Sequence, residues 1–77
     1  MNRVTLVKPA KLESLLNRLG FRKVRSKGGH ALWRHEDGRF TVVPLHHGRE
    51  LARPLLQGIL KEINLSPNRY QALLKGL

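Results

Sequence analysis

The pair Gly28-Gly29 lies between two strand-like segments and restricts the fold of this chain more than any other feature. Glycine has no Cβ, so both residues can adopt the positive φ that a two-residue turn between antiparallel strands requires. The segments Phe21 to Arg25 and His30 to His35 are therefore predicted to form a β-hairpin. From the local residues alone, the turn is either a plain connection with His30 on the surface or a place where a ligand approaches the backbone closely.

A third strand-like segment follows the hairpin. It spans Phe40 to Leu45, contains four apolar residues and comes after a turn predicted at Glu36-Asp37-Gly38-Arg39. The three segments are therefore predicted to form an antiparallel meander. Pro44 has no backbone N–H to donate, so we expect it at a strand end or edge.

The sequence allows two registers for the pairing of this third strand with the second. A two-residue Asp37-Gly38 turn places Trp33 opposite Val42, and a three-residue Asp37-Gly38-Arg39 loop places Trp33 opposite Val43. A shift of one residue reverses every side chain, so the first register directs Val42 inward and the second directs Val43 inward. The local residues are compatible with both.

The second strand has a clearer pattern. Alternation places Ala31 and Trp33 on one face and His30, Leu32 and Arg34 on the other. Tryptophan is the better core residue, so the face with Trp33 is predicted to pack inward. His30 is therefore predicted to lie on the open face of the sheet.

Three helices flank the predicted strands. The first spans Pro9 to Leu19, has leucines at the i, i+3, i+4, i+7 spacing and ends at Gly20. The second follows Pro54 and ends at Asn64, and the third begins at Ser66-Pro67. The apolar face of the second helix is predicted to contain Leu55, Leu56, Ile59, Leu60 and Ile63.

The order α-β-β-β-α-α predicts an α+β fold in which a three-stranded antiparallel sheet packs on helices. A chain of 77 residues makes a single domain, with residues 1–8 expected to be flexible. It has 15 Lys and Arg against 5 Asp and Glu, a net charge of +10, which favours a polyanion or an acidic protein as partner. The basic residues are spread over several elements, which does not fit a membrane surface.

The composition also restricts the cellular compartment and the kinds of metal site that the chain can have. There is no cysteine, which excludes a disulfide framework and a thiolate metal site. No apolar run approaches the roughly 18 residues of a membrane span, and the first residues lack the apolar region of a signal peptide. We therefore expect a cytoplasmic protein.

Short motifs occur in a set order between Ala10 and Leu74. They are Gly20-Phe21, Lys27-Gly28-Gly29-His30, Arg34-His35, Asp37-Gly38-Arg39, Val43-Pro44-Leu45-His46, Glu50-Leu51 and Ile59-Leu60-Lys61. No single motif is specific, but the ordered set resembles the HicA family of toxin–antitoxin mRNA interferases. The resemblance implies a fold similar to double-stranded RNA-binding domains, metal-independent cleavage of mRNA, and a HicB-type antitoxin as partner.

The resemblance also assigns residues. The catalytic histidine of the family's Gly-x-His motif falls on His30, and the family pattern favours the register with Val43 and Leu45 inside. The family usually has polar residues where Phe40 and Val42 stand. It often has serine where this chain has Gly29, so a hydroxyl able to contact phosphate or orient the imidazole is missing.

The chemistry agrees with this assignment. An imidazole with a pKa near 6.5 can accept the proton of an RNA 2′-hydroxyl, and Lys27 beside it can stabilise the negative charge of the transition state. His46 lies opposite His30 in the second register, where it is either the general acid or a residue that holds the following loop. The predicted RNA-binding residues are Arg22, Lys23, Arg25, Gly28, Gly29 and Arg34, although strand cations are also commonly just solvated.

The other histidines are assigned to the surface, with His35 paired to Glu36 or Asp37 and no role for His47. A metal site built from the histidines is the weaker interpretation, since the side chains of adjacent residues in a strand point to opposite faces. We therefore expect no metal and no cofactor. The alternative function is a non-catalytic RNA-binding module that uses the same basic face; for the toxin, we expect the antitoxin to cover that face.

Overall fold

The computed structural model describes residues 4–45 and 48–77. Its strands are β1 (Arg22–Lys27), β2 (His30–Arg34) and β3 (Phe40–Pro44), and its helices are α1 (Pro9–Arg18), α2 (Arg53–Glu62) and α3 (Pro67–Lys75). The sheet is antiparallel in the order β1-β2-β3. The predicted order α-β-β-β-α-α and the α+β class are confirmed.

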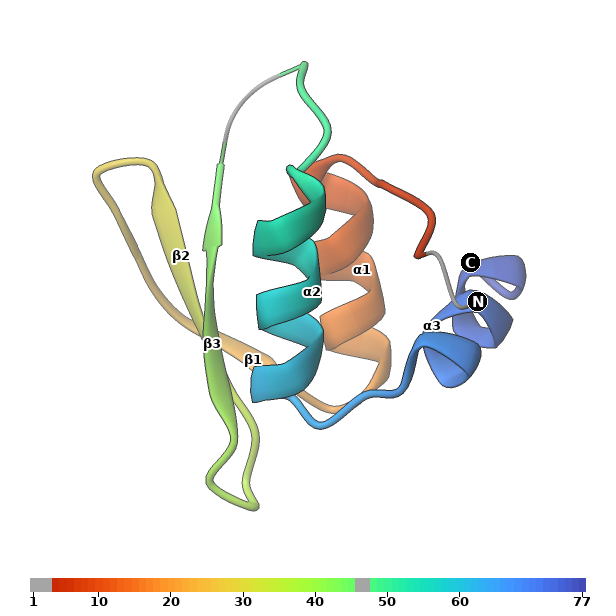
Figure 1. Cartoon of the computed structure of the whole chain (residues 1–77). Helices are drawn as coiled ribbons and strands as arrows, with labels where there is room; N and C mark the ends of the chain where they lie inside the picture. Colours follow the sequence, from red (N-terminus) through yellow and green to blue (C-terminus); the bar gives the residue numbers. More distant parts are fainter. Residues whose placement is uncertain (1–3, 46–47) are drawn as a thin grey trace.

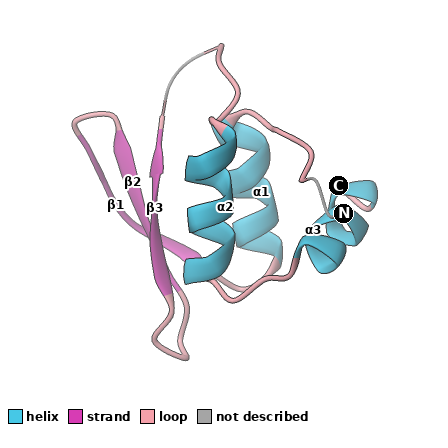
Figure 2. Cartoon of the chain, viewed as in Figure 1, coloured by secondary structure: helices cyan, strands magenta, loops and turns pink. Residues whose placement is uncertain are grey.

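The helices lie on one side of the sheet. Figure 1 shows α1 and α2 side by side against the sheet, with α3 beyond them. Figure 2 shows that the other face of the three strands is not covered by any described element. No helix in the described ranges has the length and apolar character needed to cross a bilayer.

The helix ends follow the predicted signals. Gly20 has a φ of +96°, and the Phe21 N–H donates to the Leu16 carbonyl over 3.0 Å, which closes the end of α1. Asn64, with a φ of +56°, ends α2, and the Ser66 hydroxyl accepts from the Arg69 N–H at the start of α3.

The core lies between the sheet and the two packed helices. It contains Trp33 and Ala31 from β2, so the predicted faces of that strand are confirmed. Leu55 was wrongly assigned to the buried face of α2, because its side chain is 41% exposed. It precedes the buried Leu56 by one residue, which is about 100° around a helix with 3.6 residues per turn. The buried apolar residues are Val4, Val7, Leu12, Leu15, Leu16, Phe21, Ala31, Trp33, Val43, Leu51, Leu56, Ile59, Leu60, Ile63 and Tyr70.

The β2–β3 register differs from both predicted solutions. Trp33 lies opposite Thr41, so its predicted pairings with Val42 and Val43 are wrong. His30 lies opposite Pro44, so its predicted pairing with His46 is wrong as well.

The reason is the position of the hairpin loop. The loop begins one residue earlier than predicted, at Glu36, because the His35 N–H donates to the Arg39 carbonyl over 2.8 Å. Gly38, with a φ of +100°, occupies the left-handed last position of this three-residue loop. The Asp37 carboxylate accepts hydrogen bonds from the Arg39 N–H and from the Arg39 guanidinium.

The shift of two residues keeps the same side chains inside. Val43 is fully buried and Leu45 is partly buried against the core, as the family pattern implied. Phe40 and Val42 are exposed, at 56% and 42%. Thr41, a position that sequence reasoning did not assign, is buried and donates its hydroxyl proton to the Glu62 carboxylate over 2.6 Å.

The segment before α1 contains no helix or strand in residues 4–8 but packs on the rest of the chain. Val4 and Val7 are buried, and the Leu51 N–H donates to the Val7 carbonyl over 2.9 Å. The Tyr70 hydroxyl donates to the Thr5 carbonyl over 2.6 Å. The first bond joins residues 4–8 to the segment before α2, and the second joins them to α3. Residues 1–3, also expected to be flexible, lie outside the described ranges.

Candidate nucleic-acid interface

The register assigns nine side chains to the open face of the sheet, in three rows across the strands, and of these Pro44 is buried. Directly opposite residues of an antiparallel pair share a face, so the register defines each row. The rows are Lys27, His30 and Pro44; Arg25, Leu32 and Val42; Arg22, Arg34 and Phe40. We call this set the open face.

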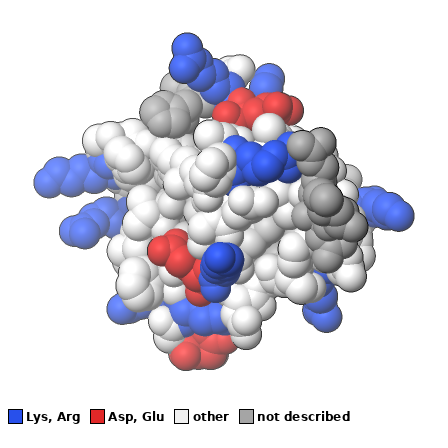
Figure 3. Space-filling view, in the orientation of Figure 1, with Lys and Arg blue, Asp and Glu red and all other residues white. Residues whose placement is uncertain are grey.

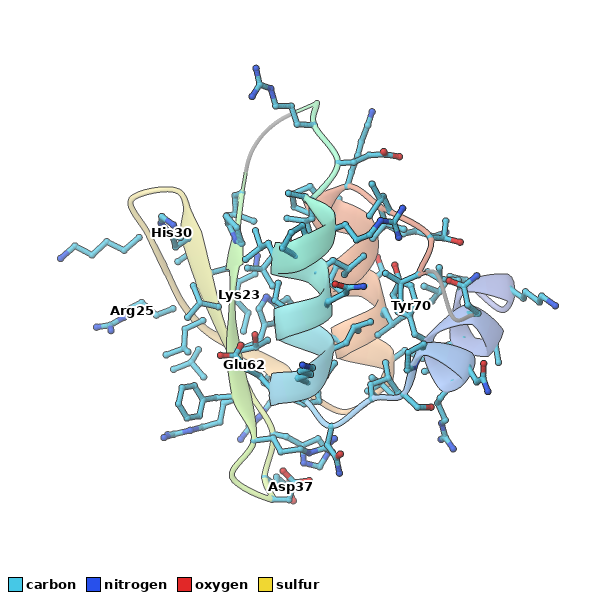
Figure 4. All side chains as sticks on the ribbon, in the orientation of Figure 1. Lys23, Arg25, His30, Asp37, Glu62 and Tyr70 are labelled. Atoms are coloured by element: carbon cyan, nitrogen blue, oxygen red, sulfur yellow. The ribbon has the colours of Figure 1, made fainter. Side chains whose placement is uncertain are left out.

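The open face is divided by charge. All three of its β1 residues are Arg or Lys, all three of its β3 residues are apolar, and none of the nine is acidic. Figure 3 shows Lys and Arg side chains extending from the sheet side of the molecule, and Figure 4 shows Arg25 projecting away from the helices. The face therefore has a cationic edge along β1 and an apolar edge along β3.

A β-bulge produces the cationic edge. Arg22 and Arg25 are three residues apart, so a regular strand would direct them to opposite faces. The register shifts between Lys23 and Arg25, which makes Val24 an additional residue in β1. The bulge therefore places Arg22, Arg25 and Lys27 on one face of the sheet.

The Gly28-Gly29 turn positions His30. The φ values of its two residues are +60° and +79°, as expected for the two-residue hairpin turn with two left-handed positions, and Lys27 lies directly opposite His30. A Cβ at either glycine would meet no atom within 4 Å, so backbone conformation is the reason for glycine here.

The turn also orients the imidazole. His30 Nδ1 lies 3.1 Å from the Gly28 carbonyl oxygen. A carbonyl oxygen only accepts hydrogen bonds, so Nδ1 is the donor and Nε2 is the acceptor of the neutral ring. In this tautomer Nε2 of the exposed imidazole has a free lone pair.

Two hollows are lined by residues of the strands and their turns. One, of about 280 Å³, is lined by Arg25, Lys27, His30, Leu32 and Val42. The other, of about 530 Å³, is lined by Arg22, Lys23, Val24, Arg34, His35, Glu36 and Gly38. The first places His30 beside two cations and two apolar side chains.

Lys23 is separated from the other predicted RNA-binding residues. Its Nζ lies 3.4 Å from the Glu13 carboxylate and 5.7 Å from the centre of the Trp33 ring, on the helix side of the sheet. The Trp33 indole Nε1 donates to the same carboxylate over 3.0 Å. The predicted residues that the structure brings together are Arg22, Arg25, Lys27, Gly28, Gly29, His30 and Arg34.

His35 directly follows β2, at the end of the strand opposite to His30. Its Nδ1 accepts from the Asp37 N–H over 3.1 Å, which confirms the predicted pairing, and its ring packs edge-on against Phe21 with centroids 5.0 Å apart. Hydrogen bonds from the Arg39 N–H and guanidinium lower the pKa of Asp37 from its usual value. His35 therefore belongs to the structure of the loop.

The predicted roles of His46 and His47 fall on residues outside the described ranges. Within those ranges, no three His, Cys, Asp or Glu residues come close enough together to hold a metal ion.

Sequence reasoning missed the apolar edge as part of the site. The signal for it was the alternation of the exposed Phe40 and Val42 with the buried Thr41 and Val43. The bulge at Val24 had no such signal.

A comparison with protein families gives a match. A family model described as the HicA toxin of bacterial toxin–antitoxin systems matches residues 9–65. The match begins at α1, includes the three strands and the Gly28-Gly29 turn, and ends after α2. A comparison with curated proteins found no match.

Proposed function

The chain belongs to the HicA toxin family of bacterial toxin–antitoxin systems, and we propose that it is an endoribonuclease that cleaves mRNA without a metal ion. The observation that supports this most is the hydrogen bond between His30 Nδ1 and the Gly28 carbonyl oxygen. It leaves Nε2 as a proton acceptor on an exposed, cationic surface. Ribonuclease activity and the role of His30 are also what the family resemblance implies.

The proposed reaction is transesterification at one phosphodiester. His30 Nε2 removes the proton of the 2′-hydroxyl, the 2′-oxygen bonds to phosphorus, and the bond from phosphorus to the 5′-oxygen breaks. Lys27 and Arg25 stabilise the negative charge that develops on the phosphoryl oxygens. The 5′-oxygen takes a proton from water or from His46, our candidate acid, and the product is a 2′,3′-cyclic phosphate.

The test is a cleavage assay with purified variants. His30→Ala should lower the cleavage rate by roughly 10²- to 10⁴-fold, the usual contribution of a general base. Its melting temperature should not change, because the side chain is exposed. Wild-type cleavage should continue in the presence of a chelator.

His35→Ala is the matched control. It removes a histidine outside the open face, so it should retain cleavage but melt at a lower temperature, because the ring packs on Phe21. His46→Ala should lose activity to a similar extent as His30→Ala only if it supplies the leaving-group proton. A fully active His30→Ala with an unchanged melting curve would favour the non-catalytic RNA-binding module.

Membership in this family implies an antitoxin partner. We propose that this partner is of the HicB type and covers the open face with acidic and apolar groups, which match its cationic and apolar edges. Mixing the two proteins should abolish cleavage, because the partner then shields His30. A complex that cuts RNA at the full rate would show that the antitoxin binds elsewhere.

A further inference from the structure

The apolar edge of the open face is unusual for a surface that binds only phosphate. The described residues include five large hydrophobic side chains that are exposed, and three of them are on the sheet. These are Val24, Phe40 and Val42, with exposures of 55%, 56% and 42%. A phosphate gains nothing from an apolar neighbour, so the β3 edge requires a ligand with an apolar part of its own.

The cationic edge restricts what that ligand is. Arg22 on β1 lies opposite Arg34 on β2, and Arg34 lies opposite Phe40 on β3. No ion pair is formed by either arginine with any other residue in the described ranges. One row therefore offers two cations and an aromatic ring, side by side and exposed. An unpaired nucleotide, with a phosphate at one end and a flat base at the other, matches this sequence of groups.

We propose that the open face binds single-stranded RNA, with phosphates along β1 and bases over β3, and that Phe40 stacks on one base. This inference rests on the proposed function and names its substrate class. Aromatic rings on an open sheet bind unpaired bases by stacking, and cations beside them hold the backbone.

The rows place Phe40 relative to the reaction. Consecutive rows are two residues apart in β3, and Phe40 is four residues from Pro44, which lies opposite His30. At about 3.3 Å per residue, the row of Phe40 lies roughly 13 Å from the row of His30. Phe40 therefore stacks on a base near the cleaved bond but out of reach of the reacting atoms. It is a positioning residue, and Arg34 beside it holds the phosphate of that nucleotide.

Duplex RNA does not fit the same surface. Its bases are stacked within the helix, and its accessible groups are phosphates, 2′-hydroxyls and the edges of bases in a shallow groove. A duplex would place polar backbone against Phe40 and Val42. The proposal therefore predicts a preference for unpaired strands.

The experiment measures binding without cleavage. Short RNAs with 2′-O-methyl groups have no nucleophile, so fluorescence anisotropy reports the affinity of the intact chain at fixed salt. The single strand should bind more tightly than the same sequence in a duplex. Phe40→Ala should bind the single strand about tenfold more weakly, whereas Phe40→Tyr should bind like the wild type. Leu55→Ala is the matched control, because Leu55 is also exposed but lies on α2.

A series of RNAs, each lacking one base, then tests stacking directly. At one position near the cleaved bond, loss of the base should weaken wild-type binding and leave Phe40→Ala unaffected. The proposal fails if Phe40→Leu binds like the wild type, if the duplex binds equally well, or if Phe40→Ala weakens only the complex with the antitoxin. Failure here with His30-dependent cleavage intact would leave the proposed function standing. Loss of single-strand selectivity would therefore contradict the stacking proposal alone, and loss of His30-dependent cleavage would contradict the proposed function.

Discussion

Lys23 and Arg25 are two residues apart in β1, yet they lie on opposite faces of the sheet. In a regular strand, residues at this spacing share a face. The bulge at Val24 reverses this relationship, so that Lys23 pairs with Glu13 on the helix side and Arg25 projects from the open face. We therefore expect different roles for these two similar cations, with Lys23 contributing to the fold and Arg25 to RNA binding.

The pair Lys23→Ala and Arg25→Ala tests this assignment. Lys23→Ala should lower the free energy of unfolding by about 0.2–1 kcal/mol, the usual contribution of a partly exposed ion pair. Arg25→Ala should leave stability unchanged and weaken RNA binding more than Lys23→Ala does. Urea denaturation and RNA titration of both variants provide the measurements. Equal losses of RNA affinity would show that the bulge does not separate the two residues functionally.

The open face also predicts how RNA binding depends on salt. Its four cations are Arg22, Arg25, Lys27 and Arg34. If each contacts one phosphate of a single strand, log K should fall with log salt concentration at a slope of about −2.8, or about −0.7 for each contact. Replacing Arg34 with alanine should reduce the slope by about 0.7, and Lys23→Ala should leave it unchanged. A slope near zero would contradict phosphate binding altogether.

The parts of the fold set by local signals were predictable. The leucine spacing and Gly20 placed α1, and alternation in β2 placed Trp33 inside and His30 outside. The β2–β3 register was not predictable, because an Asp-Gly pair is compatible with loops of several lengths and positions. The loop that forms has hydrogen bonds between Asp37 and Arg39, which the sequence pattern did not indicate. The candidate site at His30 was accordingly a prediction from the sequence, whereas the apolar edge beside it became evident only from the observed register.

The β2–β3 loop predicts a dependence of stability on pH. The folded pKa of Asp37 is lowered by the hydrogen bonds from Arg39, so its ionised form stabilises the fold above the unfolded pKa of 3.8. This stabilisation should disappear as pH falls below 3.8 and through the lower folded value. Asp37→Asn lacks the charge, so its melting temperature should be below that of the wild type at pH 6, with a smaller difference near pH 3. A difference that is the same at both pH values would exclude the charge as its cause.

Tyr70 joins α3 to the beginning of the chain, far from the open face. Burial raises its pKa to about 12, and its hydroxyl donates to the Thr5 carbonyl. Because the neutral phenol is the form favoured by folding, this stabilisation should be complete below pH 10 and lost as pH rises through about 12.

The chain has a single tyrosine, so an absorbance titration of the phenol reports Tyr70 alone. The midpoint should lie near pH 12 in the folded protein, with folding followed by circular dichroism, and near pH 10 in denaturant. Tyr70→Phe should show no phenolate signal and should unfold about 0.5–1.5 kcal/mol more easily, since the hydrogen bond to Thr5 is lost. Its cleavage rate at neutral pH should equal that of the wild type, because Tyr70 is on α3, which lies beyond α1 and α2 on the side of the sheet opposite the open face (Figure 1). A folded-state midpoint near pH 10 would mean that α3 does not remain docked on residues 4–8 in solution.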